Sequence, residues 1–294
     1  MSFLILVLVL VFFILRCEAV FYGSFSPQTM SEEYSLLIQG RSIPSDDKLY
    51  ALAGWHYIHG TSPDTVNFEH PPLAKYMIGL SEALFMNPAL LGFVFSILTL
   101  ILVYVISRKL VTTSLIAMFP SVLLSLDKIY IQFSTSSMLD IYATFFAVMS
   151  LLLLTSRKEW VMPLLGVTMG LAISCKWTSA FLLVLPVLYY AVKRDLHRLK
   201  LYPLCIFLAA LTYTASYAGF FYAGHGIHDF LDLQLKMLSF HQQRHLTANG
   251  IKPLRIPLVF LTGIEGPTQI QTLLINTDTK TLTTIGSGTG ISLY

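Results

Sequence analysis

The polar stretch from residue 23 to residue 72 holds the side chains best suited to chemistry, beginning with the adjacent carboxylates Asp46 and Asp47. A carboxylate beside an apolar surface can take a proton from a hydroxyl group, so this pair is a candidate general base. The alternative is structural, because carboxylates also cap a helix by accepting hydrogen bonds from its first amides, here a helix that begins at Lys48. The pair alone does not decide between these two roles.

An acid and an imidazole, Glu69 and His70, stand directly before Pro71 and Pro72. Each proline fixes its own backbone and biases the preceding residue towards an extended conformation, so Glu69 and His70 should be presented rigidly. Two prolines also serve simply to separate one helix from the next. The functional and the structural interpretation of this motif are therefore balanced.

Two further charged residues, Asp140 and Lys176, lie at the edges of apolar runs. An ionisable group at such a boundary usually faces a polar cavity or a charged partner rather than lipid. For Lys176 and the adjacent Trp177, a lysine that extends to the headgroups and an interfacial tryptophan are the ordinary alternative. Asp140 is the stronger candidate of the two, because it falls inside its apolar segment rather than at the start.

The histidines and cysteines do not indicate a metal site. His241 and His245 are four residues apart and share one face of any helix over about 228–247, but neither an HExxH acid nor a third ligand accompanies them. The cysteines, Cys17, Cys175 and Cys205, are odd in number and far apart, which excludes a readable disulfide or zinc pattern. We expect no metal and no cofactor.

The composition predicts an all-α polytopic membrane protein. Only 12% of the 294 residues are charged and 55% are hydrophobic, which is about half the charged share of a soluble domain. The net charge of +3 is small and the basic residues form no continuous stripe, so a nucleic-acid partner is not expected.

The apolar runs predict about seven transmembrane helices, each near the length needed to cross ~30 Å of hydrocarbon. They lie at about 3–22, 88–107, 110–126, 138–156, 160–175, 177–192 and 201–223. A signal peptide cleaved after Ala19 is the alternative for the first run. We favour an uncleaved helix, because the apolar character continues to Tyr22.

Lys and Arg gather in alternate loops, at 108–109, 157–158 and 193–200, which indicates that these loops are cytoplasmic. The loop 23–72 and the C-terminal segment 224–294 then face outside, and residues 1–223 form the transmembrane module. Residues 73–87 are mostly apolar but contain Lys75 and Glu82, so they predict an amphipathic helix on the membrane surface.

In order along roughly residues 1–262, these motifs resemble the protein O-mannosyltransferase family of the GT-C superfamily. That family has an Asp-Glu pair followed by an aromatic residue, then His-Pro-Pro-Leu-x-Lys, Leu-Asp, Lys-Trp and an external His. The matching positions here, with Asp in place of Glu at the second, are Asp46, Asp47, Tyr50, His70, Pro71, Pro72, Leu73, Lys75, Leu139, Asp140, Lys176, Trp177 and His241.

The resemblance implies a GT-C-like bundle that transfers mannose, or a similar hexose, from a polyprenyl- or dolichyl-phosphate donor to Ser or Thr hydroxyls of an acceptor protein. Transfer would occur on the extracytoplasmic face with inversion and without metal, with Asp46 as the base beside Asp47. The residues expected to bind substrate are Glu69, His70, Lys75, Asp140, Lys176, Trp177 and His241. A prokaryotic cell membrane is the expected location, with the endoplasmic reticulum membrane as the alternative.

The sequence departs from the family at Thr135, where an Arg that contacts the donor phosphate is usual. Lys75, Lys128 or Lys176 would have to replace it, and a lysine does not reproduce the bidentate guanidinium fork. The chain also has fewer spans than the family. The alternatives are therefore a transferase with a lipid or glycan acceptor, an inactive homologue that acts as a lipid-binding or partner subunit, and a truncated chain or half of a two-chain enzyme completed by a second subunit.

Overall fold

The structure of the protein is a computed structural model that describes residues 2–41 and 44–248, so the predicted C-terminal segment is described only as far as residue 248. Within this part of the chain every regular element is a helix, which confirms the all-α prediction. The elements are α1 (Ser2–Arg16), η1 (Glu18–Tyr22), α2 (Pro27–Ile38), α3 (Asp46–Ile58), α4 (Leu73–Phe85), α5 (Leu90–Leu110), α6 (Ser114–Leu126), α7 (Lys128–Ser134), α8 (Leu139–Leu154), α9 (Val161–Cys175), η2 (Trp177–Leu183), α10 (Leu185–Val192), α11 (Leu196–Ala215), α12 (Ala218–Tyr222) and α13 (Ile227–Ala248).

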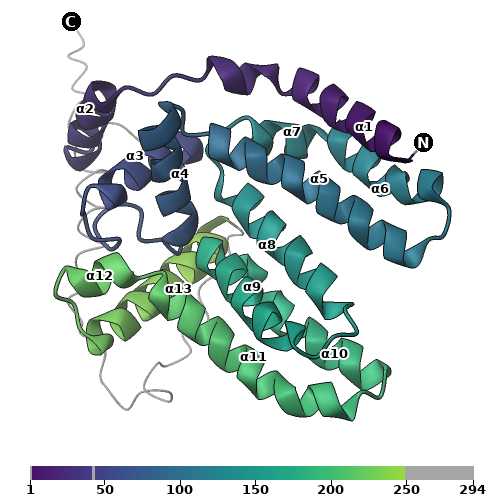
Figure 1. Cartoon of the computed structure of the whole chain (residues 1–294). Helices are drawn as coiled ribbons and strands as arrows, with labels where there is room; N and C mark the ends of the chain where they lie inside the picture. The colour runs from purple at the N-terminus through teal and green to yellow at the C-terminus, as the bar shows by residue number, and fades with distance from the viewer. Residues whose placement is uncertain (1, 42–43, 249–294) are drawn as a thin grey trace, which may run out of the picture. The chain divides into compact units, whose positions relative to one another are not determined.

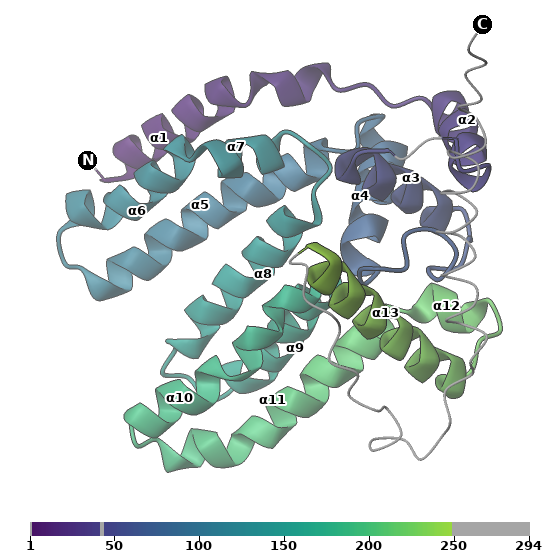
Figure 2. The same cartoon turned by 180° about the vertical axis from the view of Figure 1, so that it is seen from behind.

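The long helices form two neighbouring groups, as Figures 1 and 2 show. In the first group α5 packs against α6 and α7, and α1 lies against α6. In the second group α9 packs between α8 and α11, and α10 lies against α11. Contacts between α5 and α8 join the two groups.

The three basic turns lie together at one end of these helices. Lys109, at the end of α5, donates to the Leu152 carbonyl oxygen of α8 over 3.4 Å. Arg198, in the first turn of α11, donates to the Ser156 carbonyl oxygen over 2.6 Å. Helices α2, α3, α4, α12 and α13 lie at the opposite end (Figure 1). The alternation of charge along the sequence therefore corresponds to a separation in space.

The prediction of seven spans is not confirmed. Among the described residues, α5 is the one helix that is both long and apolar enough to cross a membrane by itself. Helices α6 and α7 together form a second candidate that is bent by 67° at the break between them. The other predicted spans are shorter or divided: 177–192 begins as the 3-10 helix η2, and 201–223 breaks between α11 and α12.

Large apolar side chains nevertheless cover the outward faces of several helices. Those at least 55% exposed include Leu8 and Leu15 on α1, Leu115, Ile116 and Phe119 on α6, Leu188 on α10 and Phe207 on α11. Exposed apolar surface of this extent is uncommon on soluble monomers and is typical of surfaces that contact another molecule or lipid. The fold therefore fits an apolar surrounding better than water.

Helix α4 has the reverse of the polarity expected for an amphipathic surface helix. Lys75 and Glu82 are both fully buried, whereas Leu80 and Leu84 are 46% and 62% exposed. A helix that lies on a membrane with its charges in water would turn these residues the other way. The 73–87 segment is helical as predicted, but its charged face is directed into the protein.

The contact between α9 and α11 depends on two glycines one turn apart. A Cβ atom built on Gly166 would lie 2.6 Å from the Cys205 carbonyl oxygen, and one built on Gly170 would lie 2.6 Å from that of Ala209. Small residues at this spacing let two helices approach until their backbones touch. The Gly-x-x-x-Gly pattern of α9 thus sets how close α11 lies.

We predict that Gly170→Ala lowers the stability of the detergent-solubilised protein by about 1–3 kcal/mol, because the added methyl group overpacks the helix contact. The matched control is Gly92→Ala in α5, where the nearest atom to the added Cβ would be 3.4 Å away. Thermal unfolding followed by circular dichroism compares the two. Equal melting temperatures for both variants would show that the α9–α11 contact is loose.

Candidate functional site

The α3–α4 hairpin builds the core of the candidate site. The two helices cross at glycines, where a Cβ atom on Gly54 would lie 2.6 Å from the Lys75 carbonyl oxygen and 2.7 Å from the Gly79 nitrogen. This close crossing lets the ring of Tyr50 on α3 approach that of His70, just before α4, to a centroid distance of 5.9 Å. Two segments of the first polar loop are thereby brought into contact.

The carboxylate pair occupies the first turn of α3. Asp46 is the first residue of the helix, Asp46 is exposed and Asp47 is half-buried. The helix therefore begins two residues before Lys48, and Ser45 rather than an aspartate holds the N-cap position. The backbone carbonyl of Asp47 accepts a hydrogen bond of 2.7 Å from the Ser137 hydroxyl, which fixes this helix start to the turn before α8.

Lys75 is buried and holds the loop that carries Glu69 and His70 through hydrogen bonds. Its amine donates to the His70 carbonyl oxygen over 2.7 Å and to the Asn67 carbonyl oxygen, and lies 5.6 Å from the Tyr57 ring centroid. Burial holds the pKa of the Lys75 amine well below its ordinary value. The described contacts of the Lys75 amine are to the loop and to the Tyr57 ring of α3. This predicted substrate-binding residue therefore acts by holding the loop in place.

His70 and His241 face one another, with ring centroids 5.2 Å apart. The Nε2 atom of His241 lies 2.8 Å from the Glu69 carbonyl oxygen, and since a carbonyl only accepts, the nitrogen must carry the proton. This contact joins two segments that are 172 residues apart in sequence, the loop before α4 and helix α13.

Trp177 lies beside this pair, with its ring centroid 6.4 Å from that of His241. Its indole nitrogen donates to the Tyr213 hydroxyl over 2.7 Å, and that hydroxyl donates to the Gln234 side-chain oxygen over 2.5 Å. The tryptophan is therefore fixed by α11 and α13 rather than free to turn towards headgroups.

Asp140 and Lys176 form an ion pair with 2.7 Å between the carboxylate oxygen and the amine nitrogen. Their side chains are 26% and 24% exposed, so the pair is accessible from outside. Leu139 and Cys175, their chain neighbours, share an apolar cluster with Tyr50 and with Ala74 of α4. The ion pair thus lies at the end of the molecule that also holds the α3–α4 hairpin.

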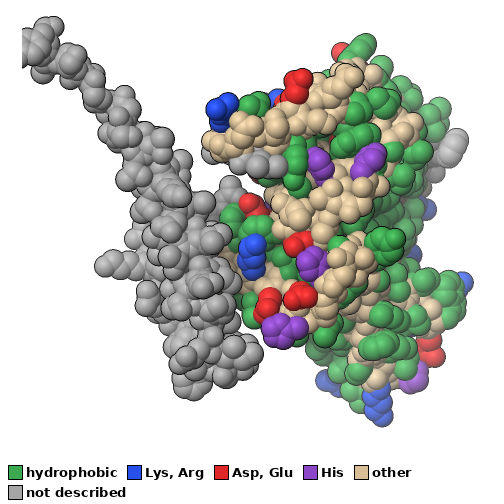
Figure 3. All heavy atoms as spheres, turned by 90° about the vertical axis from the view of Figure 1, so that its left-hand side faces the viewer, with side chains coloured by type: hydrophobic (Ala, Val, Ile, Leu, Met, Phe, Trp, Pro, Cys, Tyr) green, Lys and Arg blue, Asp and Glu red, His purple; other side chains and the backbone are tan. Residues whose placement is uncertain are grey.

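The structure brings every predicted site residue to this one end, although the sequence did not identify the residues that hold them. Those residues are Ser137, Asn67, Tyr57, Tyr213 and Gln234. None has a local pattern that marks it, because each acts through a partner distant in sequence. Figure 3 shows acidic, basic and histidine side chains gathered on the face formed by α2, α3 and α12.

Thr135, which stands where the family usually has an arginine, is used locally. Its hydroxyl donates to the carbonyl oxygens of Ile131 and Gln132, both at 3.1 Å, at the end of α7. It presents no cation to the site. Lys176 is therefore the partly exposed cation that the ordered motifs supply there.

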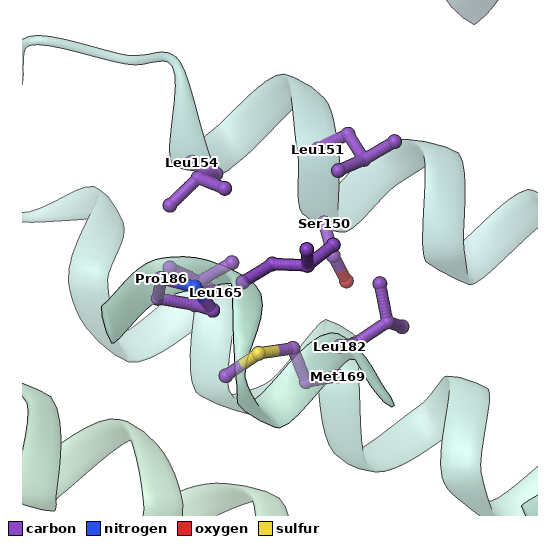
Figure 4. A pocket seen from close by; sticks show the side chains of 8 residues that line it. Ser150, Leu151, Leu154, Leu165, Met169, Leu182 and Pro186 are labelled. Atoms are coloured by element: carbon purple, nitrogen blue, oxygen red, sulfur yellow. The ribbon is translucent and has the colours of Figure 1, made fainter. Parts of the chain in front are cut away.

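A small, partly open cavity of about 10 Å3 lies between α8, α9, η2 and α10, away from these residues (Figure 4). Its lining is aliphatic apart from one serine, and consists of Ser150, Leu151, Leu154, Leu165, Met169, Leu182, Leu185 and Pro186. None of the predicted site residues contributes to it. Among the described residues, no group of three or more His, Cys, Asp or Glu side chains is placed to hold a metal ion.

We predict that Lys75→Met destabilises the protein by about 1–3 kcal/mol and loosens the 59–72 loop, because two partly buried carbonyl groups lose their donor. The control Lys48→Met removes a surface pair with Glu33 at 3.5 Å and should change stability by less than about 1 kcal/mol. Thermal unfolding and limited proteolysis of the loop measure both effects. If both variants unfold and are cleaved alike, Lys75 does not hold the loop.

Comparison with known proteins identifies one family. The family model described as dolichyl-phosphate-mannose-protein mannosyltransferase matches residues 69–218, about half of the chain. No curated protein and no solved structure shows significant similarity to the chain. The matched range contains Glu69 and His70 at the end of the loop before α4, the Asp140–Lys176 pair and Trp177, whereas Asp46, Asp47 and His241 lie outside it. On the strength of this match the chain belongs to the dolichyl-phosphate-mannose-protein mannosyltransferase family, whose members are membrane glycosyltransferases of the GT-C type.

Proposed function

We propose that the chain transfers mannose, or a similar hexose, from a polyprenyl- or dolichyl-phosphate donor to Ser or Thr hydroxyls of proteins, with inversion at the anomeric carbon. The observation that carries the proposal is the meeting of three polar groups at one end of an apolar helix bundle. These are the helix start at Asp46 and Asp47, the Asp140–Lys176 ion pair, and the facing His70 and His241 rings.

Asp46 acts as the general base in this proposal. An acceptor hydroxyl has a high pKa and attacks only if its proton is removed as the new bond forms, a task that a positioned carboxylate performs. Asp46 is exposed at the first turn of α3, where an incoming hydroxyl can reach it. The Ser137–Asp47 hydrogen bond keeps this turn at a fixed distance from α8.

Lys176 stabilises the departing phosphate in this proposal. A leaving group that gains negative charge needs a cation placed in advance, and Asp140 orients the Lys176 amine from 2.7 Å. A lysine supplies a point charge rather than a planar fork, so the phosphate would be held less firmly than by an arginine. His241 lies beside Trp177 and faces His70, and in this proposal the two histidines contact the sugar or the phosphate.

The membrane disposition belongs to the same proposal. A donor that carries a polyprenyl chain stays in the bilayer, which explains why a polar cluster would lie at the end of helices with apolar outer faces. With the basic turns in the cytoplasm, the cluster faces the extracytoplasmic side. The predicted seven spans and the surrounding bilayer are part of what we propose.

Asp46→Asn should reduce transfer by about 10²- to 10⁴-fold, because an amide is isosteric with the carboxylate but does not take the proton. The assay uses proteoliposomes supplied with polyprenyl-phosphate mannose and a Ser/Thr-rich peptide, and counts labelled peptide. Asp232→Asn on α13, whose side chain is 63% exposed, is the matched control and should keep full activity. Full activity in the Asp46 variant would remove Asp46 from the mechanism.

A second candidate function, an inactive homologue that binds lipid or a partner subunit, is favoured by Thr135. The hydroxyl of this residue is bound to the α7 backbone and offers nothing to a phosphate. If this candidate is correct, wild-type protein shows no transfer, and Thr135→Arg gains at least about tenfold over background because the guanidinium restores the phosphate contact. Thr155→Arg, at the opposite end of α8, is the control. Activity in the wild type that Thr135→Arg does not improve excludes the inactive homologue.

A further inference from the structure

A carboxyl group without a hydrogen-bond partner is buried inside the protein at Glu82. The residue is 0% exposed, and neither of its carboxyl oxygens has a partner among the described residues. The hydroxyl of Tyr142, which is 1% exposed, is likewise buried without a hydrogen bond of ordinary geometry, although the backbone of Gly92 lies close to it. Buried polar groups are nearly always satisfied in folded proteins, so two such groups in one region call for an explanation.

The two groups lie where four helices meet. Glu82 is seven residues after Lys75 and so falls on the same face of α4. Helix α4 packs against α3, α5, α8 and α9, and its Ile78 shares an apolar cluster with Tyr142 of α8. A Cβ atom added to Gly92, at the start of α5, would lie 3.4 Å from the Tyr142 hydroxyl.

The protonation state of Glu82 decides what it can do there. An ionised carboxylate without a partner is expensive to bury, so burial raises the pKa of Glu82 to about 9. The group is then neutral at physiological pH and carries one O–H donor. The Glu82 carboxyl and the Tyr142 hydroxyl are thus two buried polar groups on helices that contact each other, α4 and α8.

The other titratable groups on the helices around Glu82 either have a hydrogen-bond or ion-pair partner or lie at other positions along those helices. Lys75, on the same helix, is bound to loop carbonyls, and Asp140 of α8 is paired with Lys176. Helix α5 has no titratable residue before Tyr104. The remaining titratable groups at this end of the packed helices are Asp46, Asp47, Lys48 and Tyr50 on α3 and Cys175 on α9.

We propose that Glu82 is a positioning residue whose neutral carboxyl group donates a hydrogen bond to one buried water that in turn bonds to the Tyr142 hydroxyl, and so fixes α4 to α8. Helix α4 holds the Glu69–His70 loop through Lys75, and α8 carries Asp140 two residues before Tyr142. The bond therefore sets the separation of the loop from the Asp140–Lys176 pair. Its consequence for sugar transfer rests on the proposed function, whereas the bond itself does not.

The first test is a double-mutant cycle on stability. Tyr142→Phe should lower the unfolding temperature in the wild-type background, and should have no such effect when Glu82→Leu is already present, because the bond is then gone. An equal effect of Tyr142→Phe in both backgrounds would overturn the proposal. This comparison needs no enzymatic activity.

The second test is the pH dependence of unfolding in Glu82→Gln, which keeps a donor but does not ionise. The folded-state pKa of Glu82 lies above the ordinary value of 4.5, so wild-type stability is greatest below that value and falls as the pH rises towards about 9. The glutamine variant should match the wild type near pH 5 and unfold at increasingly higher temperatures than the wild type up to about pH 9. Glu32→Gln, on the exposed side of α2, should show no widening difference.

Infrared spectroscopy supplies a direct signature. The wild-type protein should show the carbonyl stretch of a protonated carboxylic acid at neutral pH, this band should be absent from Glu82→Gln, and Tyr142→Phe should shift it. Absence of the band from the wild type, or a constant stability difference across pH, means that Glu82 is ionised and overturns the proposal.

Activity then tests positioning. In the transfer assay, Glu82→Leu should lose activity at least tenfold and Glu82→Gln should retain most of it. Equal activity of the two variants means that the bond does not position the site. If no variant and no wild-type protein transfers sugar, the stability and infrared results still decide the state of Glu82, and only the proposed function fails.

Discussion

The crossing of α3 and α4 at Gly54 and Gly79 is the constraint on which the candidate site depends. The backbones of the two helices touch there, and a side chain at either position would force them apart. Only at this separation can Tyr50 reach His70, and only then does Lys75 pass under the loop to bind its carbonyl groups. The orientation of the first polar loop therefore follows from two residues that have no chemistry of their own.

Hydrogen bonds between helices help to stabilise the packing of this helix bundle. Where the surroundings are as apolar as the side chains, helices gain little from hiding leucines, and polar contacts and close packing hold them together. The Tyr130 hydroxyl donates to the Ser96 carbonyl oxygen over 2.8 Å, and Ser121 bonds across to the Leu100 carbonyl oxygen over 3.0 Å. Ser150 and Thr168 join α8 to α9 in the same way over 2.9 Å.

The sequence identified the order of the motifs and the apolar helices, because those features depend on local composition and charge. It did not identify which face of α4 is buried. Periodicity shows that a helix has a polar and an apolar face, but not which of them packs against the protein. Nor could it assign Trp177 to Tyr213, because such a partner is selected by the packing of α9 against α11. The break between α11 and α12 at Ser216–Tyr217 likewise has no proline or glycine to mark it, whereas Pro186 stands in the first turn of α10, where the 177–192 segment changes from 3-10 to α-helix.

The family match covers the middle of the chain, yet the candidate site is completed by segments on either side of that range. Two contacts attach these outer segments to it: the Ser137 hydroxyl binds the Asp47 carbonyl oxygen, and His241 binds the Glu69 carbonyl oxygen. The first contact uses the backbone of Asp47, so it fixes that segment without demanding a particular side chain there, whereas the second uses the imidazole of His241. The side chain of Asp47 is consequently left out of its contact, and the first turn of α3 is held in place independently of the carboxylates that it carries.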